Sequence, residues 1–402
     1  MTENATLTIE EARLEPQEDL GRLQRKAWLV GGAAAVALAV GYLTAEPADF
    51  FRAYLIGWLF CLGVAMGLSG INMLNHMSGG DWGVSLRRVL EASGRTLPYF
   101  LVTGVPLAFG LADVYHWAMP GGLDPASSKA RYLLNPAAFL IWSAVILIVW
   151  TILAYALSAF SHRYEATGEE RHRVRMKRLS GAGLVIYVLT GTIASVLWIM
   201  SLDPHWFSSL FGFIFVAGQG LSAFAFAVPA LLFLAARQPF RDRVAPKTIV
   251  KLFHDYGKLM LAFVALWAYF MMSQFLIIWS GNLPEEVTWY LDRAGAGWLW
   301  ISVLLVLGHF VLPFIVLLSQ DLKKHGRRLL WVALWLLAMR WFDLYWQVAP
   351  SASHEHVVFT WMEPVAPIAL GGLWLGLLAG QLKNRALLPV REPELAEVLV
   401  HG

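Results

Sequence analysis

Ionisable and amide side chains occur inside several long apolar stretches of this 402-residue chain. An ionisable residue at the centre of a bilayer costs roughly 2.5–3.5 kcal/mol on insertion scales, so it is either paired or used. Arg340 and Asp343 are three residues apart and share one face of a helix. They predict either an internal salt bridge or a step of a proton path, with His309 as a packing residue or a relay member. The other deep polar residues are Gln219, Tyr269, Ser273 and Gln274.

A second set of polar residues is predicted near the helix ends that adjoin basic loops. Lys258 lies within about one helical turn of His254 and Asp255. Such a cluster could take up protons and pass them to the polar middle of the chain, and we expect His76 and Asp81 to contribute. The alternative is that these side chains only reach the membrane interface.

A third set is predicted at the opposite helix ends, where it would form a proton exit or a docking surface. Its members are Asp113, His116, Asp203, His205 and Glu363. Together, the three sets describe two half-channels that meet in the second half of the chain.

The composition identifies the environment of these residues. The chain is 58% hydrophobic and 15% charged, with a mean hydropathy of +0.56. Soluble domains carry about 25% charged residues, so we expect an integral membrane protein. Its 19 Trp residues suit two interfacial belts.

Apolar runs long enough to span a bilayer predict an all-α protein with ten transmembrane helices. Residues 1–26 and 386–402 are read as cytoplasmic tails, flanking a membrane domain over 27–385. The expected spans are 27–44, 52–76, 97–115, 136–160, 181–202, 207–236, 252–279, 297–320, 329–349 and 365–382.

A weak internal repeat groups these spans. Helices 2 to 5 begin about 150–160 residues before helices 6 to 9. Similar endings, WIMSLDPHWF and RWFDLYWQVAP, support two four-helix bundles (helices 2–5 and 6–9) with helices 1 and 10 outside. The alternative is that evenly spaced helices look repetitive in any case.

The distribution of basic residues predicts the orientation. Every even-numbered loop is rich in Lys and Arg, as are both chain ends, whereas the odd-numbered loops are mostly acidic. The positive-inside rule therefore places both termini in the cytoplasm.

Several cofactors and partners are excluded by composition and motif. A single cysteine, Cys61, rules out disulfides, cysteine-ligated iron–sulfur clusters and covalent haem attachment within the chain. Among the histidines only His309 is deep, so b-type haem lacks a second ligand at matching depth. No nucleotide-binding or zinc motif is present, so we expect no metal, no nucleic acid and no catalytic residue.

Three stretches resemble the F subunit of alternative complex III, within the NrfD and polysulfide-reductase membrane-anchor family. They are LDPHWFSSLFG (202–212), the stretch from His254 to Glu286, and RWFDLYWQVAP (340–350). The resemblance covers about residues 27–385. It implies ten helices in two four-helix bundles, a bacterial inner-membrane location and a place in a respiratory or photosynthetic electron-transport chain.

The resemblance also implies partners. These are a multihaem cytochrome c subunit, an iron–sulfur subunit and a homologous C-type membrane subunit, with a terminal oxidase or a soluble carrier as electron acceptor. In that family, quinol oxidation is associated with the C subunit, and a proton-conducting role has been proposed for the F subunit.

Three functions follow as hypotheses. The first is a cofactor-free, proton-translocating and assembly subunit of a quinol oxidoreductase. The second is a subunit that itself binds and oxidises quinol, with quinone or menaquinone as ligand. The third is a stand-alone secondary transporter. The helices lack the Gly-interrupted pairs at matched midplane positions that are typical of such transporters, which argues against this hypothesis.

Overall fold

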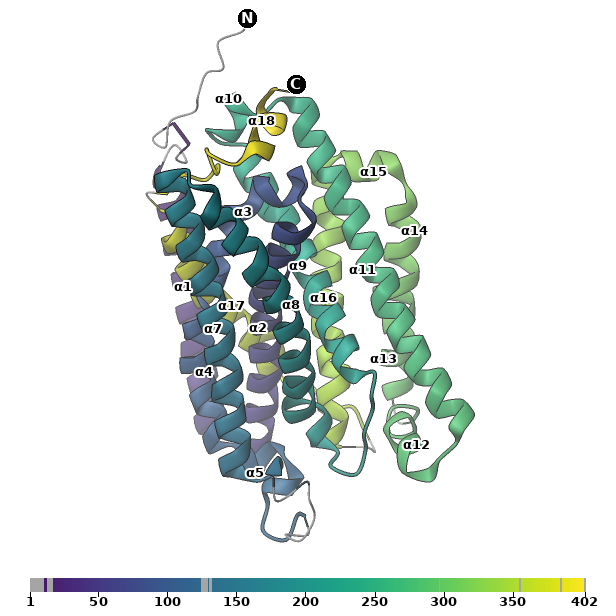
Figure 1. Ribbon diagram of the computed structural model, residues 1–402. Helices are drawn as coiled ribbons and strands as arrows, with labels where there is room; N and C mark the ends of the chain where they lie inside the picture. The colour runs from purple at the N-terminus through teal and green to yellow at the C-terminus, as the bar shows by residue number, and fades with distance from the viewer. Residues whose placement is uncertain are drawn as a thin grey trace, which may run out of the picture.

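The computed structural model describes residues 11–12, 17–123, 129, 132–295, 297–353, 356–383 and 385–400. These residues form an elongated bundle of helices and contain no β-strand (Figure 1). The two chain ends lie at the same end of the bundle, near α10 (Phe240–Arg243) and α18 (Pro393–Val400), with α15 (Gln320–Lys324). We call it the termini end; the opposite, far end carries α5 (Leu111–Val114) and α12 (Pro284–Leu291).

Nine helical segments among the described residues are long and apolar enough to cross a membrane. The chain is thus an all-α protein suited to a membrane. The segments are α1 (Gln17–Thr44), α2 (Pro47–Ser78), α7 (Pro136–Thr167), α8 (Glu170–Trp198), α9 (Phe211–Ala235), α11 (Pro246–Gly281), the run from α13 (Trp298–Leu305) through η3 (Val306–Val311) to α14 (Leu312–Leu318), α16 (Gly326–Val348) and α17 (Met362–Leu382).

The expected span 97–115 is the one that does not form a single long helix. It divides into α4 (Leu97–Phe109) and α5, separated by Gly110. Pro106 lies inside α4, and a Cβ at Gly110 would lie 2.1 Å from the Phe51 ring. At 1.5 Å per residue α4 is about 20 Å long, short of the roughly 30 Å hydrocarbon core.

Helix α2 forms the centre of the molecule. It is buried along almost its whole length and packs against α3 (Asp81–Arg95), α8, α9 and α17. Close approach to α9 depends on Gly67, where a Cβ would lie 2.1 Å from the Gln219 carbonyl oxygen. Helix α9 in turn packs against α11 and α16, while α7 packs on α8 and α1 on α17.

The segment 79–96 differs from the expected basic loop. It contains α3, in which Arg87, Arg88 and Glu91 are buried. These charges are internal because they pair: Arg87 contacts Glu392, which is also buried, and Arg88 contacts Glu91 at 2.8 Å. Part of the expected C-terminal tail also packs against the bundle, with Leu387, Leu388 and Leu395 buried.

Candidate proton path

The deepest ionic contact joins Arg340 and Asp343 on α16, as their spacing predicted. Both side chains are almost fully buried, with Arg340 2% and Asp343 0% exposed. Two further donors hold the carboxylate: Gln347 Nε2 at 2.9 Å and Trp267 Nε1 at 3.2 Å. The pair is therefore fixed on both α16 and α11. A Cβ at Gly218 on α9 would lie 2.3 Å from the Arg340 guanidinium carbon. Only glycine at this position leaves room for the guanidinium group.

His309 lies on η3, a π-helical turn within the α13–α14 run. Pro313, at the start of α14, has no N–H and cannot continue the backbone pattern. In the i→i+5 pattern the Gly308 carbonyl would need the nitrogen of residue 313. The Trp335 indole N–H donates to that carbonyl instead, at 2.7 Å. The π turn is thus stabilised from α16.

The His309 ring contacts Trp267, with ring centroids 4.1 Å apart. His309 is completely buried, and neither ring nitrogen has a hydrogen-bond partner among the described residues. Because Trp267 also donates to Asp343, it bridges the histidine and the ion pair. Buried polar atoms are almost always hydrogen-bonded to protein or water. Both ring nitrogens of His309 can therefore still form a hydrogen bond with another group.

Gln219 on α9 is joined to α8. The Tyr187 hydroxyl donates to Gln219 Oε1, and both side chains are buried. Gln219 Nε2 has no partner within the described part of the chain. Gly218, its neighbour, lies against the Arg340 guanidinium. The structure therefore brings together four of the predicted deep residues, Gln219, His309, Arg340 and Asp343, and adds Tyr187, Trp267 and Gln347.

The three predicted deep residues of α11 lie outside this cluster, and one of them, Ser273, is half-buried. Tyr269 is 64% exposed and faces away from the cluster. Gln274 is buried but accepts a hydrogen bond from Ser208, nearer the far end. Trp267 was not singled out from the sequence, although helical spacing places it on the buried face of α11. That face carries Met260, Val264, Trp267, Gln274 and Ile278, and Tyr269 and Ser273 lie outside it.

The predicted uptake residues lie in three separate places. Lys258 contacts Asp255 at 3.3 Å on the surface of α11, next to His254, and Lys258 is 56% exposed. Asp81 instead pairs with Lys251. His76, on α2, has a buried Nε2 without a partner among the described residues. None of these side chains is recorded in contact with the deep cluster.

The predicted exit residues also have different environments. Glu363 is fully buried and pairs with Arg52 at 2.6 Å, linking α17 to α2. Asp203 accepts the backbone N–H of His205 at 3.1 Å, and so closes a turn. Asp113, His116 and His205 are exposed at the far end. Only these three present surface groups suited to docking.

A buried ionic cluster on α3 was not recognised from the sequence. Arg88 contacts Glu91 on its own helix and Glu165 on α7, at 2.8 and 2.6 Å. Burial alone would raise the pKa of Glu91, but Arg88, together with a hydrogen bond from Ser161 and the charge of Arg87, holds that pKa below its usual range. Glu91 is therefore an ionised carboxylate inside the helical bundle.

No family model matches the sequence, and no curated protein matches it. Among the described residues, no three His, Cys, Asp or Glu side chains are arranged to hold a metal ion.

Proposed function

We propose that this chain is a cofactor-free subunit of a quinol:electron-acceptor oxidoreductase in a bacterial inner membrane, and that it conducts protons. The supporting observation is the buried Arg340–Asp343 pair beside His309. The resemblance to the NrfD-like F subunit of alternative complex III supplies the class of complex. In this proposal α4 and α5 complete ten spans, arranged in two four-helix bundles with α1 and α17 outside.

The chemistry of the cluster supports proton transfer. A proton that reaches Asp343 neutralises the carboxylate and leaves Arg340 without its counter-charge. The arginine then favours release of that proton to another acceptor. Neutral His309 has one donor and one acceptor nitrogen, so it can accept a proton at one and release it from the other. Its location on a π turn, a feature frequent at functional sites, agrees with this role.

The surface suggests where partners bind. Basic residues gather in the loops of the termini end, which the positive-inside rule assigns to the cytoplasm. The far end would then face the cytochrome c and iron–sulfur subunits, with haem c and the clusters held by those partners. Asp113, His116 and His205 are exposed there for docking.

The test is to isolate the complete chain with its native partners from membranes by mild detergent extraction. We expect co-purification with haem c, seen by visible spectroscopy, and with iron–sulfur signals in electron paramagnetic resonance. In vesicles, Asp343→Asn should at least halve the protons moved per electron, whereas Asp321→Asn, in an exposed pair with Arg328, should not. Purification without haem proteins would favour a transporter, and an unchanged proton yield would remove Asp343 from the path.

A second candidate, quinol binding, is favoured by one observation. A cavity of about 240 Å³ lies between α2, α4, α7 and α8. Its Tyr115 hydroxyl already donates to the Trp198 carbonyl, and the Trp198 indole donates to Ser143, both at 2.9 Å. The cavity therefore suits an isoprenoid tail better than a quinone head group that needs donors. Cross-linking by a photoreactive quinone within this cavity would support the second candidate; labelling confined to partners would exclude it.

A further inference from the structure

Buried polar atoms without partners are concentrated where α2 faces α3. Within the described residues, no hydrogen bond is made by Asn72 Oδ1, His76 Nε2, Arg87 Nε, Arg88 Nε or Glu91 Oε1. A buried polar atom that stays unsatisfied is energetically unfavourable. Native proteins meet this need with ordered internal water when no protein group is available. Two of these residues, Asn72 and Glu91, line the same cavity, which points to a water site there.

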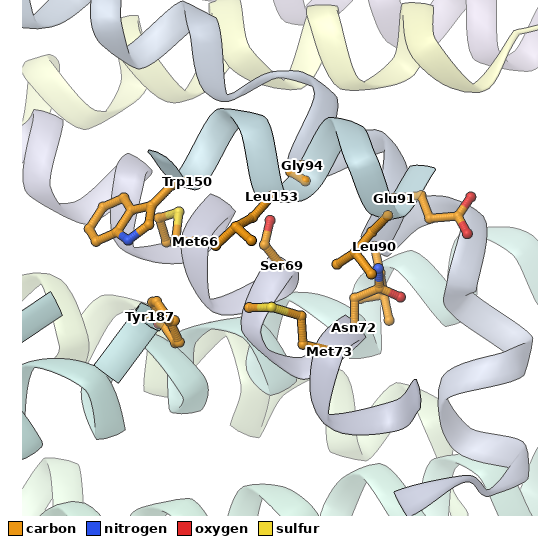
Figure 2. A pocket seen from close by; sticks show the side chains of 12 residues that line it. Met66, Ser69, Asn72, Met73, Leu90, Glu91, Gly94, Trp150, Leu153 and Tyr187 are labelled. Carbon is orange, nitrogen blue, oxygen red and sulfur yellow. The ribbon is translucent and has the colours of Figure 1, made fainter. Parts of the chain in front are cut away.

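A cavity lies beside this group. Its free volume is about 20 Å³, which is room for about one water molecule. Figure 2 shows Trp150 and Tyr187 on one side of it and Asn72 and Glu91 on the other, with Ser69 between. The cavity thus separates the ionic cluster of α3 from Tyr187 on α8.

Beyond Tyr187 there is one further polar contact, and after it only close packing. The Tyr187 hydroxyl donates to Gln219, and the adjacent Gly218 lies against Arg340. Arg340 in turn holds Asp343. Two gaps therefore interrupt a route from Glu91 to Asp343. One is the cavity between Asn72 and Tyr187, and the other lies between Gln219, whose Nε2 has no partner among the described residues, and the Arg340–Asp343 pair.

We propose that Asn72 and Glu91 bind internal water in this cavity, and that this water joins Glu91 to Tyr187 as the first part of a route toward the Arg340–Asp343 pair. The water link serves as the proton uptake route from the termini end, a role that rests on the proposed function. Uptake thus proceeds through α3 and not through the surface cluster at His254. Only O–H bonds form and break along this link, because each oxygen that accepts a proton on one side releases one on the other, and no bond between heavy atoms changes.

The charges around Glu91 fit an uptake site. Arg87, Arg88 and Arg95 lie on its own helix, His76 faces it from α2, and Glu165 reaches Arg88 from α7. Glu165 is 12% exposed, so the cluster extends to the protein surface. An ionised Glu91 accepts hydrogen bonds from water and orients it.

Hydroxyl-radical footprinting of the complete complex in membranes tests the water site directly. X-ray pulses generate radicals from bound water, which oxidise adjacent methionines. Met66 and Met73 line the cavity, whereas Met176 and Met260 are fully buried and do not. We expect at least fivefold more oxidation of Met66 or Met73 than of the two controls. Equal oxidation of all four would overturn the proposal.

Variants then test the link. Asn72→Leu keeps the side-chain size but removes the amide, and should lower Met73 oxidation to the control level and halve the protons moved per electron. Gln24→Leu, a similar change on α1 beside Gly380, should alter neither. Maleimide protection of buried Cys61 checks that each variant is folded. Unchanged Met73 oxidation in Asn72→Leu would overturn the water site.

The two proposals fail in different ways. If Asn72→Leu lowered Met73 oxidation but left the proton yield unchanged, the water site would be supported and its role in proton uptake would be overturned. A wild-type complex that moves no protons would overturn the proposed function and the uptake role together, while footprinting still decides whether water is bound.

Discussion

Removing either charge of the Arg340–Asp343 pair should destabilise the protein far more than removing both. Arg340 is 2% exposed and Asp343 0%, so solvent screens neither charge. Breaking such a pair costs about 3–5 kcal/mol, whereas replacing both partners by apolar residues is often neutral. We therefore expect Asp343→Leu and Arg340→Met each to lose about 3–5 kcal/mol, and the double variant to lose less than either.

The only cysteine of the chain provides the assay. Cys61 is buried, with its sulfur 3.6 Å from the Pro367 carbonyl oxygen, so a maleimide dye reacts with it only on opening. Labelling of the purified full-length chain in detergent, measured against denaturant, gives the unfolding free energy of each variant. Asp321→Asn is the matched control, because the Asp321–Arg328 pair is exposed and should contribute about 1 kcal/mol or less.

The outcome that would refute this reasoning is additivity. If the double variant lost the sum of the two single losses, the charges would act independently and the pair would not be a coupled buried unit.

Three further outcomes follow from other contacts. Glu363→Gln should cost about 1–3 kcal/mol in the Cys61 assay, because buried Arg52 would lose a charged hydrogen-bond acceptor and keep only Asp49 as its counter-charge; a wild-type unfolding midpoint would contradict this. Trp335→Phe should cost about 1–3 kcal/mol by leaving the Gly308 carbonyl without its donor, and thermal unfolding by circular dichroism that matches the wild type would argue against it. The depressed pKa of Glu91 means that its ionised form stabilises the fold above about pH 4.3, the usual glutamate value. This contribution is lost as the pH falls through the lower, folded pKa, so Glu91→Gln should flatten the acid limb of stability against pH; parallel limbs would contradict the shift.

The sequence predicted most accurately what depends on neighbours along the chain. Long apolar runs indicated the membrane helices, and the i,i+3 spacing of Arg340 and Asp343 indicated their contact. The division of the span 97–115 into two helices was harder to predict. It accompanies a proline, Pro106, and a close contact of Gly110 with Phe51. That contact comes from a residue far away in the chain.

Helix α3 shows why the number of charged residues in a segment does not reveal whether that segment is buried. Arg87 and Arg88 look like loop residues because their partners, Glu392 and Glu165, are distant in sequence. Burial of charge becomes plausible only when the pairing is known. Tyr187 was missed for the same reason, since nothing local connects it to Gln219.

The contact between Arg87 and Glu392 also has a consequence for biogenesis. Arg87 is synthesised about 300 residues before Glu392, as their separation of 305 positions implies. Helix α1 likewise packs against α17, the last apolar helix. The earlier segments must therefore wait in the membrane, with the buried Arg87 lacking its carboxylate partner, until Glu392 has been synthesised. A premature stop after Lys383 would leave the nine described membrane-crossing helices in place but Arg87 without Glu392, which would give quality-control proteases a specific signal to recognise incomplete chains.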